Sequence, residues 1–167
     1  RTDGLGATYS GANTLYENLG STTQGLIADN YTDAINLLSN KDDYRFNIIT
    51  APGLVYANAT HKTPLNVLLS NVQNRGVAIV VMDLENYGST VSAITGTAAS
   101  VDNSYVSAYW PWLQLVDPDS GQLVWTPAST LIPGVYAFND KTSEAWFAPA
   151  GINRGGLSNV VQAERKL

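Results

Sequence analysis

The residue types that could support hydrolytic chemistry are few in this sequence. His61 is the only histidine, and a Ser–His–Asp triad needs a histidine that takes the serine proton and an acid that orients the histidine. Gly88-Ser89 is the one Gly-Ser pair in a plausible turn, and no convergent acid, base and nucleophile can be assembled with it. We therefore predict no catalytic residue and expect His61 to be a surface or helix-entry residue.

Two acidic pairs could also carry chemistry. Asp83 and Glu85 follow the apolar run 77–82, at the carboxyl end of an expected strand, where α/β folds often place functional residues. A solvated strand end is the simpler interpretation of this pair. Asp42 and Asp43 have no third ligand at calcium-binding spacing. We interpret them as a solvated turn and predict no metal site.

Composition argues against several other kinds of site. The glycine-rich run 151–156 does not have the Walker pattern, and no G-x-G-x-x-G run surrounds Gly53, so we predict no nucleotide or other cofactor. The net charge is −5 without a Lys/Arg run, which argues against nucleic-acid binding. No apolar run approaches the roughly 20 residues of a membrane helix. The absence of cysteine excludes disulfides and cysteine-based zinc sites.

The first half of the sequence alternates strand and helix patterns. A short helix capped by Thr32 comes first. One strand is expected at 44–50 and should end at Ala51-Pro52-Gly53. A second strand is expected at 77–82, because a continuous apolar run is typical of a strand buried on both faces. Between them a helix should begin at Thr63-Pro64, with an apolar face formed by Leu65, Leu68, Leu69 and Val72.

The elements that follow complete an α/β pattern. After a weak helix over 91–99, aromatic and β-branched residues predict one buried strand over 105–116. Pro and Gly in 117–121 indicate a turn, which leads into a return strand at 122–125. Thr126 should cap a helix that begins near Ser129, and a last strand is expected at 157–161. The sequence therefore predicts a three-layer α/β sandwich with a mainly parallel sheet plus an antiparallel hairpin.

Three motifs follow one another in the second half of the sequence. They are Tyr109-Trp110-Pro111-Trp112, the run Gly-Val-Tyr-Ala-Phe-Asn-Asp over 134–140, and the run 146–155 with its Pro-Ala-Gly-x-Asn-Arg-Gly elbow. This order resembles that of the tail sheath proteins of contractile bacteriophages. The resemblance is dense over 105–161, looser over 31–104 and unsupported over 1–30. The structural motif residues that it marks are Trp110, Pro111, Trp112, Gly134, Tyr136, Asp140, Trp146, Pro149, Gly151, Asn153, Arg154 and Gly155.

The resemblance implies a structural protein without enzymatic activity or cofactor. Sheath subunits form homo-oligomeric rings that stack helically around the inner tail tube protein in the virion tail, after assembly in the host cytoplasm. Contraction of the sheath drives the tube through the host envelope. The family's core is often described as subtilisin-like, and terminal arms of one subunit add strands to the sheet of the next. This resemblance predicts other sheath subunits and the tail tube as partners.

The domain organisation is expected to be simple. Residues 31–167 are expected to form a sheath-like core domain, as a fragment of a longer chain, and the Gly-, Ser-, Thr- and Asn-rich residues 1–30 an irregular flanking segment. Only 14% of the residues are charged, compared with about 25% in an average globular protein, which is consistent with a surface covered by neighbours. We expect the isolated fragment to be monomeric.

Two alternative functions remain open at this stage. One is an α/β hydrolase-like enzyme, and the other is a carbohydrate-binding module whose aromatic platform is formed by Trp110 and Trp112. Exposed tryptophans would favour the platform and buried ones would exclude it.

Arg154 is the only charged residue of the 149–156 elbow. Its planar guanidinium could bond several carbonyls or a carboxylate, so we expect Arg154 to lock the elbow against the core and to position the last strand.

Overall fold

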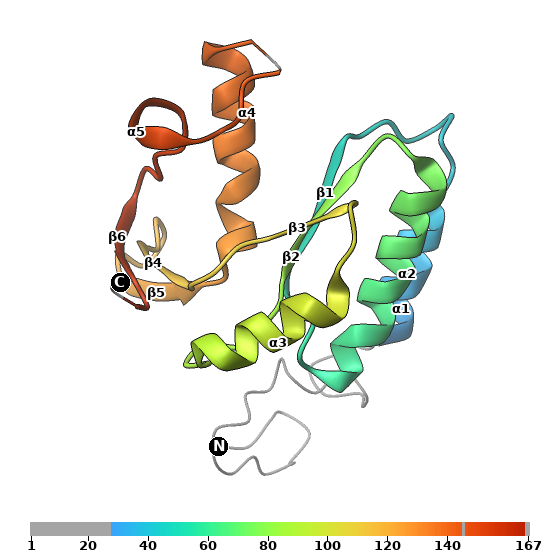
Figure 1. Cartoon of the computed structure of the whole chain (residues 1–167), viewed down its shortest axis with the longest axis horizontal. Helices are drawn as coiled ribbons and strands as arrows, with labels where there is room; N and C mark the ends of the chain where they lie inside the picture. The colour runs from blue at the N-terminus through green and yellow to red at the C-terminus, as the bar shows by residue number, and fades with distance from the viewer. Residues whose placement is uncertain (1–27, 145, 166–167) are drawn as a thin grey trace.

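The computed structural model describes residues 28–144 and 146–165 of the chain. It contains a three-stranded sheet in the order β1-β2-β3 and a second three-stranded sheet in the order β5-β4-β6, with helices packed around them (Figure 1). The α/β class, the parallel strands and the antiparallel hairpin are confirmed. The expected irregular segment lies outside the described residues except for 28–30, which belong to the first helix.

The first half of the chain forms the parallel sheet through two strand–helix–strand units. Ile49 pairs with Val80, and Val80 pairs with Val106, in parallel register. The elements are α1 (Ala28–Leu37), β1 (Ile48–Val55), α2 (Ala59–Arg75), β2 (Ile79–Asp83), α3 (Val91–Val101) and β3 (Val106–Ala108).

The ends of these elements differ from those expected. α1 begins at Ala28 rather than after Thr32, and β1 continues through Pro52 and Gly53 to Val55, with an irregular register between Thr50 and Val55. A β-strand tolerates proline where its pairing is already irregular.

α2 begins before Thr63-Pro64, so that Pro64 lies inside the helix. The carbonyl of Asn58 accepts hydrogen bonds from the amides of His61 and Lys62, which starts the helix one turn earlier than proline alone would indicate. The end of α2 is as expected: Arg75 lies in the last turn, and Gly76 caps it at a φ of 76°, a conformation that favours glycine.

The second half of the chain forms the antiparallel sheet and the helices beside it. Leu115 pairs with Val124 of the hairpin and with Val160 of the last strand. The elements are β4 (Leu113–Val116), β5 (Leu123–Thr126), the short 3-10 helix η3 (Ala128–Thr130), α4 (Ile132–Thr142), α5 (Gly151–Arg154) and β6 (Val160–Ala163).

The single strand expected over 105–116 is wrong, because β3 and β4 belong to different sheets. Pro111 lies between them after a cis Trp110-Pro111 peptide bond, and proline has no amide to donate to a strand ladder. Thr126 is not a helix cap but the last residue of β5. The last strand is β6, which begins at Val160 rather than at 157.

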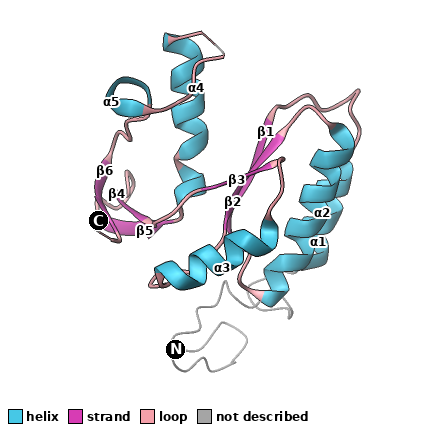
Figure 2. Ribbon diagram, viewed as in Figure 1, coloured by secondary structure: helices cyan, strands magenta, loops and turns pink. Residues whose placement is uncertain are grey.

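The parallel sheet separates two hydrophobic cores. Helices α1 and α2 lie on one side of the sheet and α4 on the other (Figure 2). Successive residues of a strand point to opposite faces. Val80 and Met82 accordingly pack in the larger core with α1 and α2, to which α3 adds Ile94 and Val101 at its edge. Val81 packs on the other face with residues of β4, η3 and α4. Within the described part of the chain, none of the helices has the length and apolar character needed to cross a membrane.

Candidate functional site

The residues that follow β2 connect both halves of the molecule. We call residues 83–89 the β2 exit loop. It lies at the carboxyl end of the parallel sheet, the side on which open α/β folds bind ligands. In this chain, the polar groups of the loop contact other parts of the same chain, so the partners of each residue define what the loop can do.

Asp83 is buried at the end of β2 and holds the start of the second half in place. Its side chain is 3% exposed and accepts hydrogen bonds from the amide (3.1 Å) and the hydroxyl of Ser129 in η3. Burial raises the pKa of Asp83, and the two hydrogen bonds from Ser129 oppose this rise. The expected solvated position for Asp83 is therefore wrong, because the second core closes over the end of β2.

Glu85 connects the loop to α3 and to the residues just before β4. Its carboxylate accepts hydrogen bonds from Thr97 of α3 (2.5 Å) and from Ser89 (3.2 Å). Its backbone carbonyl accepts a bond from the indole nitrogen of Trp112 (2.9 Å), just before β4. Asn86 and Asn58 exchange two side-chain hydrogen bonds, and this pair ties the loop to the start of α2.

An aromatic group and one carboxylate fasten the antiparallel sheet to the same loop. The ring of Tyr87 lies 5.0 Å from that of Trp125 in β5 and 6.2 Å from that of Trp112. The carboxylate of Glu164 accepts hydrogen bonds from the amides of Gly88 and Trp112, and the amide of Glu164 donates to the carbonyl of Trp112 at 2.8 Å. Both β5 and the end of β6 are therefore attached at this point.

The two residues considered for hydrolytic chemistry have separate partners. His61 lies at the start of α2, as a helix-entry residue, but it is fully buried rather than on the surface. Its Nδ1 accepts a hydrogen bond from the amide of Val55 at 3.0 Å. Ser89 donates to Glu85. Within 28–144 and 146–165, no group of His, Asp and Glu residues is arranged to hold a metal ion.

The two tryptophans of the first motif do not form an exposed platform. Trp112 is 8% exposed. Trp110 is half-buried, and its buried indole nitrogen has no hydrogen-bond partner among the described residues. Pro111 between them is also half-buried. A carbohydrate platform needs an open ring face, so these residues do not support that alternative.

The motif residues of α4 have different surroundings. Tyr136 contacts Tyr109 through both hydroxyls, with the rings 6.3 Å apart and edge to face, whereas Asp140 is exposed. Asn139 lies within the same motif but was not among the residues marked by the resemblance. It is 2% exposed. Its amide nitrogen donates to the carbonyl of Phe147 at 2.9 Å and fixes the segment after α4.

The 149–156 elbow contains the short helix α5, which begins at Gly151 with a φ of 77°. A Cβ atom at Gly155 would meet the Cα of Ala150 at 3.0 Å, so a side chain there would press against the backbone. Asn153 is exposed, and Pro149 is half-buried.

The expected hydrogen-bonded lock at Arg154 is wrong. The guanidinium lies 4.8 Å from the centre of the Phe147 ring, and the buried Nε has no hydrogen-bond partner among the described residues. The carboxylate that fastens the last strand is that of Glu164, some distance along the chain, which no local pattern indicates.

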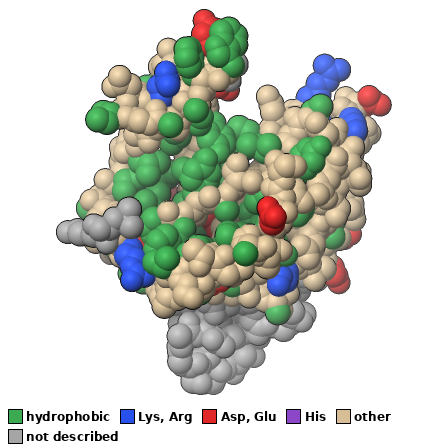
Figure 3. Space-filling view, in the orientation of Figure 1, with side chains coloured by type: hydrophobic (Ala, Val, Ile, Leu, Met, Phe, Trp, Pro, Cys, Tyr) green, Lys and Arg blue, Asp and Glu red, His purple; other side chains and the backbone are tan. Residues whose placement is uncertain are grey.

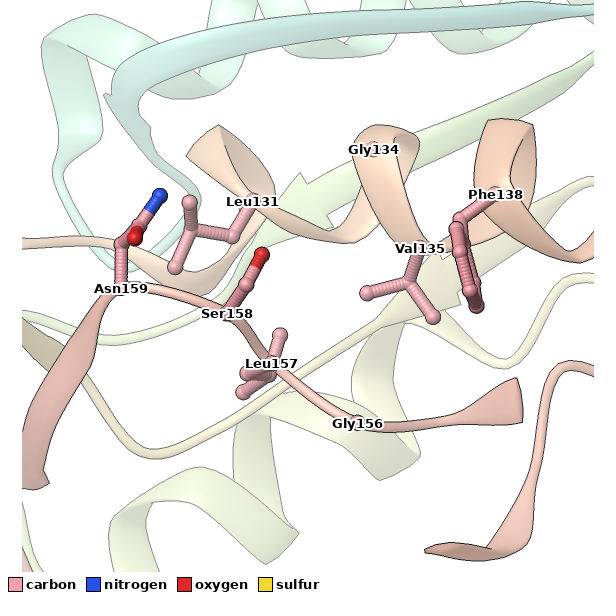
Figure 4. Close-up of a pocket in the computed structure, with 8 residues that line it drawn as sticks. All are labelled: Leu131, Gly134, Val135, Phe138, Gly156, Leu157, Ser158 and Asn159. Atoms are coloured by element: carbon pink, nitrogen blue, oxygen red, sulfur yellow. The ribbon is translucent and has the colours of Figure 1, made fainter. Parts of the chain in front are cut away.

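An apolar surface lies around α4 and α5. Trp146 is 78% exposed and Ile152 is 99% exposed. Beside them a groove of about 280 Å³ runs between α4 and residues 156–159, where Val135 and Phe138 face the segment of Leu157 (Figure 4). Gly134 also lines this groove. Figure 3 shows hydrophobic side chains gathered over this side of the molecule and in the hollow beside it.

Comparisons with known proteins point to phage tails. No protein-family model matches the chain. It is 27% identical over 96 residues to a tail sheath protein of Vibrio phage KVP40, a match that covers 54% of this chain and 14% of that protein. It is also 27% identical over 86 residues to the tail sheath protein of Enterobacteria phage T4, covering 52% of this chain and 13% of that protein. The matched part is thus a small share of either relative, and over about half its length the chain is similar to structural proteins of phage tails.

Proposed function

We propose that this chain is part of a structural subunit of a contractile phage tail sheath. The subunit polymerises around the inner tail tube in the virion, and the sheath contracts to drive the tube through the host envelope. The similarity to two tail sheath proteins supports this proposal. The observation that carries the proposal is the β2 exit loop. Its polar groups bind other residues of the same chain, at the place where an α/β enzyme binds its substrate.

Three acidic residues in and beside the loop illustrate this use. Asp83 is bound by Ser129, Glu85 by Thr97 and Ser89, and Glu164 by two backbone amides. A catalytic acid needs access to substrate and a proton to transfer. In this proposal these carboxylates instead hold two sheets in one rigid unit, and the chain is not an enzyme and needs no cofactor.

A rigid unit suits a sheath, because contraction is a rigid-body rotation of subunits between two sets of interfaces. The energy is stored in those interfaces, without nucleotide or metal. The partners in this proposal are other sheath subunits and the tail tube protein, and the core is a variant of the subtilisin-like core of that family. The isolated chain is then mostly monomeric and does not form tubes by itself.

The antiparallel sheet offers edges at which a neighbour's arm can pair. β5 and β6 are its outer strands, and Leu123 and Val161 on them are more than half exposed. Unpaired strand edges readily accept another strand. We assign the arm contact implied by the sheath resemblance to this sheet.

Antibody labelling of virions tests the proposal. Antibodies raised against this chain should label intact contractile tails along their whole length when viewed by electron microscopy, because a sheath subunit repeats in every ring. Antibodies against a capsid protein, as the control, should leave the tail unlabelled. Labelling confined to the tail tip or to the head would overturn the proposed function.

A further inference from the structure

The connection between α1 and β1 carries a basic pocket on an acidic chain. Its volume is about 360 Å³, and its lining includes Lys41, Arg45 and Arg75. The whole chain has nine Lys and Arg residues against fourteen Asp and Glu residues. Three cations around one pocket are therefore a local reversal of the overall charge.

Arg75 is buried in this pocket, and no carboxylate of the described residues pairs with it. It is 6% exposed and stacks over the ring of Phe46 at 4.1 Å. Its terminal nitrogens donate to the carbonyls of Leu38 and Tyr44, and its buried Nε has no partner among the described residues. Buried charges in proteins are usually paired with an opposite charge, and carbonyl groups carry no net charge.

Lys41 adds to the excess of positive charge. Its ammonium donates to the carbonyls of Asn74 (3.0 Å) and Arg75 (3.2 Å) at the end of α2. A helix end supplies only about half of one negative charge, which is less than the charge of Lys41, Arg45 and Arg75 together. Asp42 and Asp43 belong to the same connection, but both are exposed, and Asp43 accepts a hydrogen bond from Asn40. No ion pair joins either of them to the three cations within the described residues.

The turn between β4 and β5 has the complementary charge. It carries Asp117 and Asp119, and no basic residue lies within 117–121. The hydroxyl of Ser120 and the amide of Asp119 donate to the carboxylate of Asp117. These bonds lower the pKa of Asp117, with the Ser120 hydroxyl as the main cause. The turn therefore presents negative charge on a fixed backbone.

The pocket and the turn lie on opposite sides of the molecule, since the β4–β5 pair is far from the connection between α1 and β1 (Figure 1). The two surfaces of one chain therefore cannot meet each other. A contact between different patches of two copies is heterologous, and such contacts repeat into rings or helices. This geometry is the one that a stacked sheath requires.

We propose that the basic pocket of Lys41, Arg45 and Arg75 receives the acidic β4–β5 turn of a second copy of this chain. The inference rests on the proposed sheath function and adds the surface through which two subunits meet. The carboxylate of Asp119 is the exposed anion of the turn. Lys41 and Arg45 are both exposed in the pocket, and because Lys41 already donates to two carbonyls, Arg45 is the cation that meets Asp119. Contacts between exposed charges are weak individually and screened by salt, so the isolated chain associates only at high concentration.

Charge reversal with sedimentation velocity tests this contact. At low salt and high protein concentration the wild-type chain should self-associate weakly. Arg45→Glu and Asp119→Lys should each weaken the association constant about tenfold, because each places like charges opposite one another. The double variant R45E/D119K should recover to within about threefold of the wild type, because the exchanged charges pair again. Lys141→Glu and Asp102→Lys repeat the same charge changes on exposed residues elsewhere and should leave association unchanged.

Three outcomes would overturn the inference. One is a wild-type chain that stays monomeric at every concentration tested, and another is a pair of reversals without effect on association. The third is a titration in which inorganic phosphate shifts the amide resonances of residues 41, 45 and 75 while Asp119→Lys has no effect, because the pocket would then hold a free oxyanion. None of these results bears on the virion labelling, which tests the sheath role separately.

Discussion

At the scale of single residues, Asp83 shows how the fold uses a carboxylate in its interior. The side chain is buried at the end of β2 and bound by Ser129 alone among the described residues. Burial disfavours the charged form, and this raises the pKa of Asp83 in spite of the two hydrogen bonds. The folded state therefore binds the Asp83 proton more tightly than the unfolded state does.

This raised pKa predicts a pH dependence of stability. The contribution of Asp83 to the free energy of unfolding is fully present below the unfolded pKa of about 3.9, and it is lost as the pH rises through the higher folded value. Asp83→Asn keeps an acceptor for the Ser129 amide but cannot ionise. Urea unfolding over a pH series should show the variant gaining stability relative to the wild type as the pH rises. Asp140→Asn, on an exposed residue, should show no such gain, and a constant difference for Asp83→Asn would contradict the prediction.

Arg154 has a smaller role than a hydrogen-bonded lock would give it. Its guanidinium stacks on Phe147, which is 44% exposed. An exposed cation–π pair contributes about 0.5–1 kcal/mol. Arg154→Ala should therefore lower the free energy of unfolding by about that amount, and Arg154→Lys should retain part of it. A loss of several kcal/mol in chemical denaturation would show that Arg154 has hydrogen-bond partners as well.

Residue identity alone predicted little of the candidate site. His61 was expected at the entry to a helix and lies in the first turn of α2, but its complete burial was not expected. The burial of Asp83 and the attachment of Glu164 depend on Ser129 and Gly88, which are 46 and 76 residues away in the chain. No local periodicity carries information about such pairs, so these residues could be found only once the two sheets had been placed together.

At the scale of elements, short-range signals predicted well and prolines misled. The β4–β5 hairpin, α3 and the glycine cap of α2 were predicted because turn and capping residues act over a few positions. Pro64 and Pro52 were taken as boundaries, yet both lie inside elements. Pro111 was taken as part of a strand, yet it separates two sheets. Tertiary packing decides which of these roles a proline has.

Trp112 connects the elements of the second half to the β2 exit loop. Trp112→Phe keeps an aromatic ring against Tyr87 but leaves the carbonyl of Glu85 without its 2.9 Å donor. The loss should be about 1 kcal/mol, the usual net contribution of one hydrogen bond, because this contact is partly buried. Trp146→Phe is the matched control, because Trp146 is 78% exposed, and it should change stability by less than about 0.5 kcal/mol. Equal unfolding midpoints for the two variants would contradict the assigned role of Trp112.

At the scale of the whole molecule, two cores on either side of one parallel sheet are joined at the β2 exit loop. The α/β class followed from the alternation of strand and helix patterns. The division of the strands into two sheets did not, because it depends on how the chain turns after Trp110. The exposed Trp146 and Ile152, the low charge content and the open strand edges all suit a chain whose neighbours cover part of its surface.

We expect the protein that carries this chain to assemble into a sheath, and electron microscopy of that purified protein is the decisive measurement. It should form hollow tubes with regular cross-striations, in which the two-sheet fold fits the density of each subunit, whereas the 167-residue chain alone should give no tubes. Protein that remains as dispersed particles at every salt and protein concentration, also in the presence of tail tubes, would overturn the proposed sheath function.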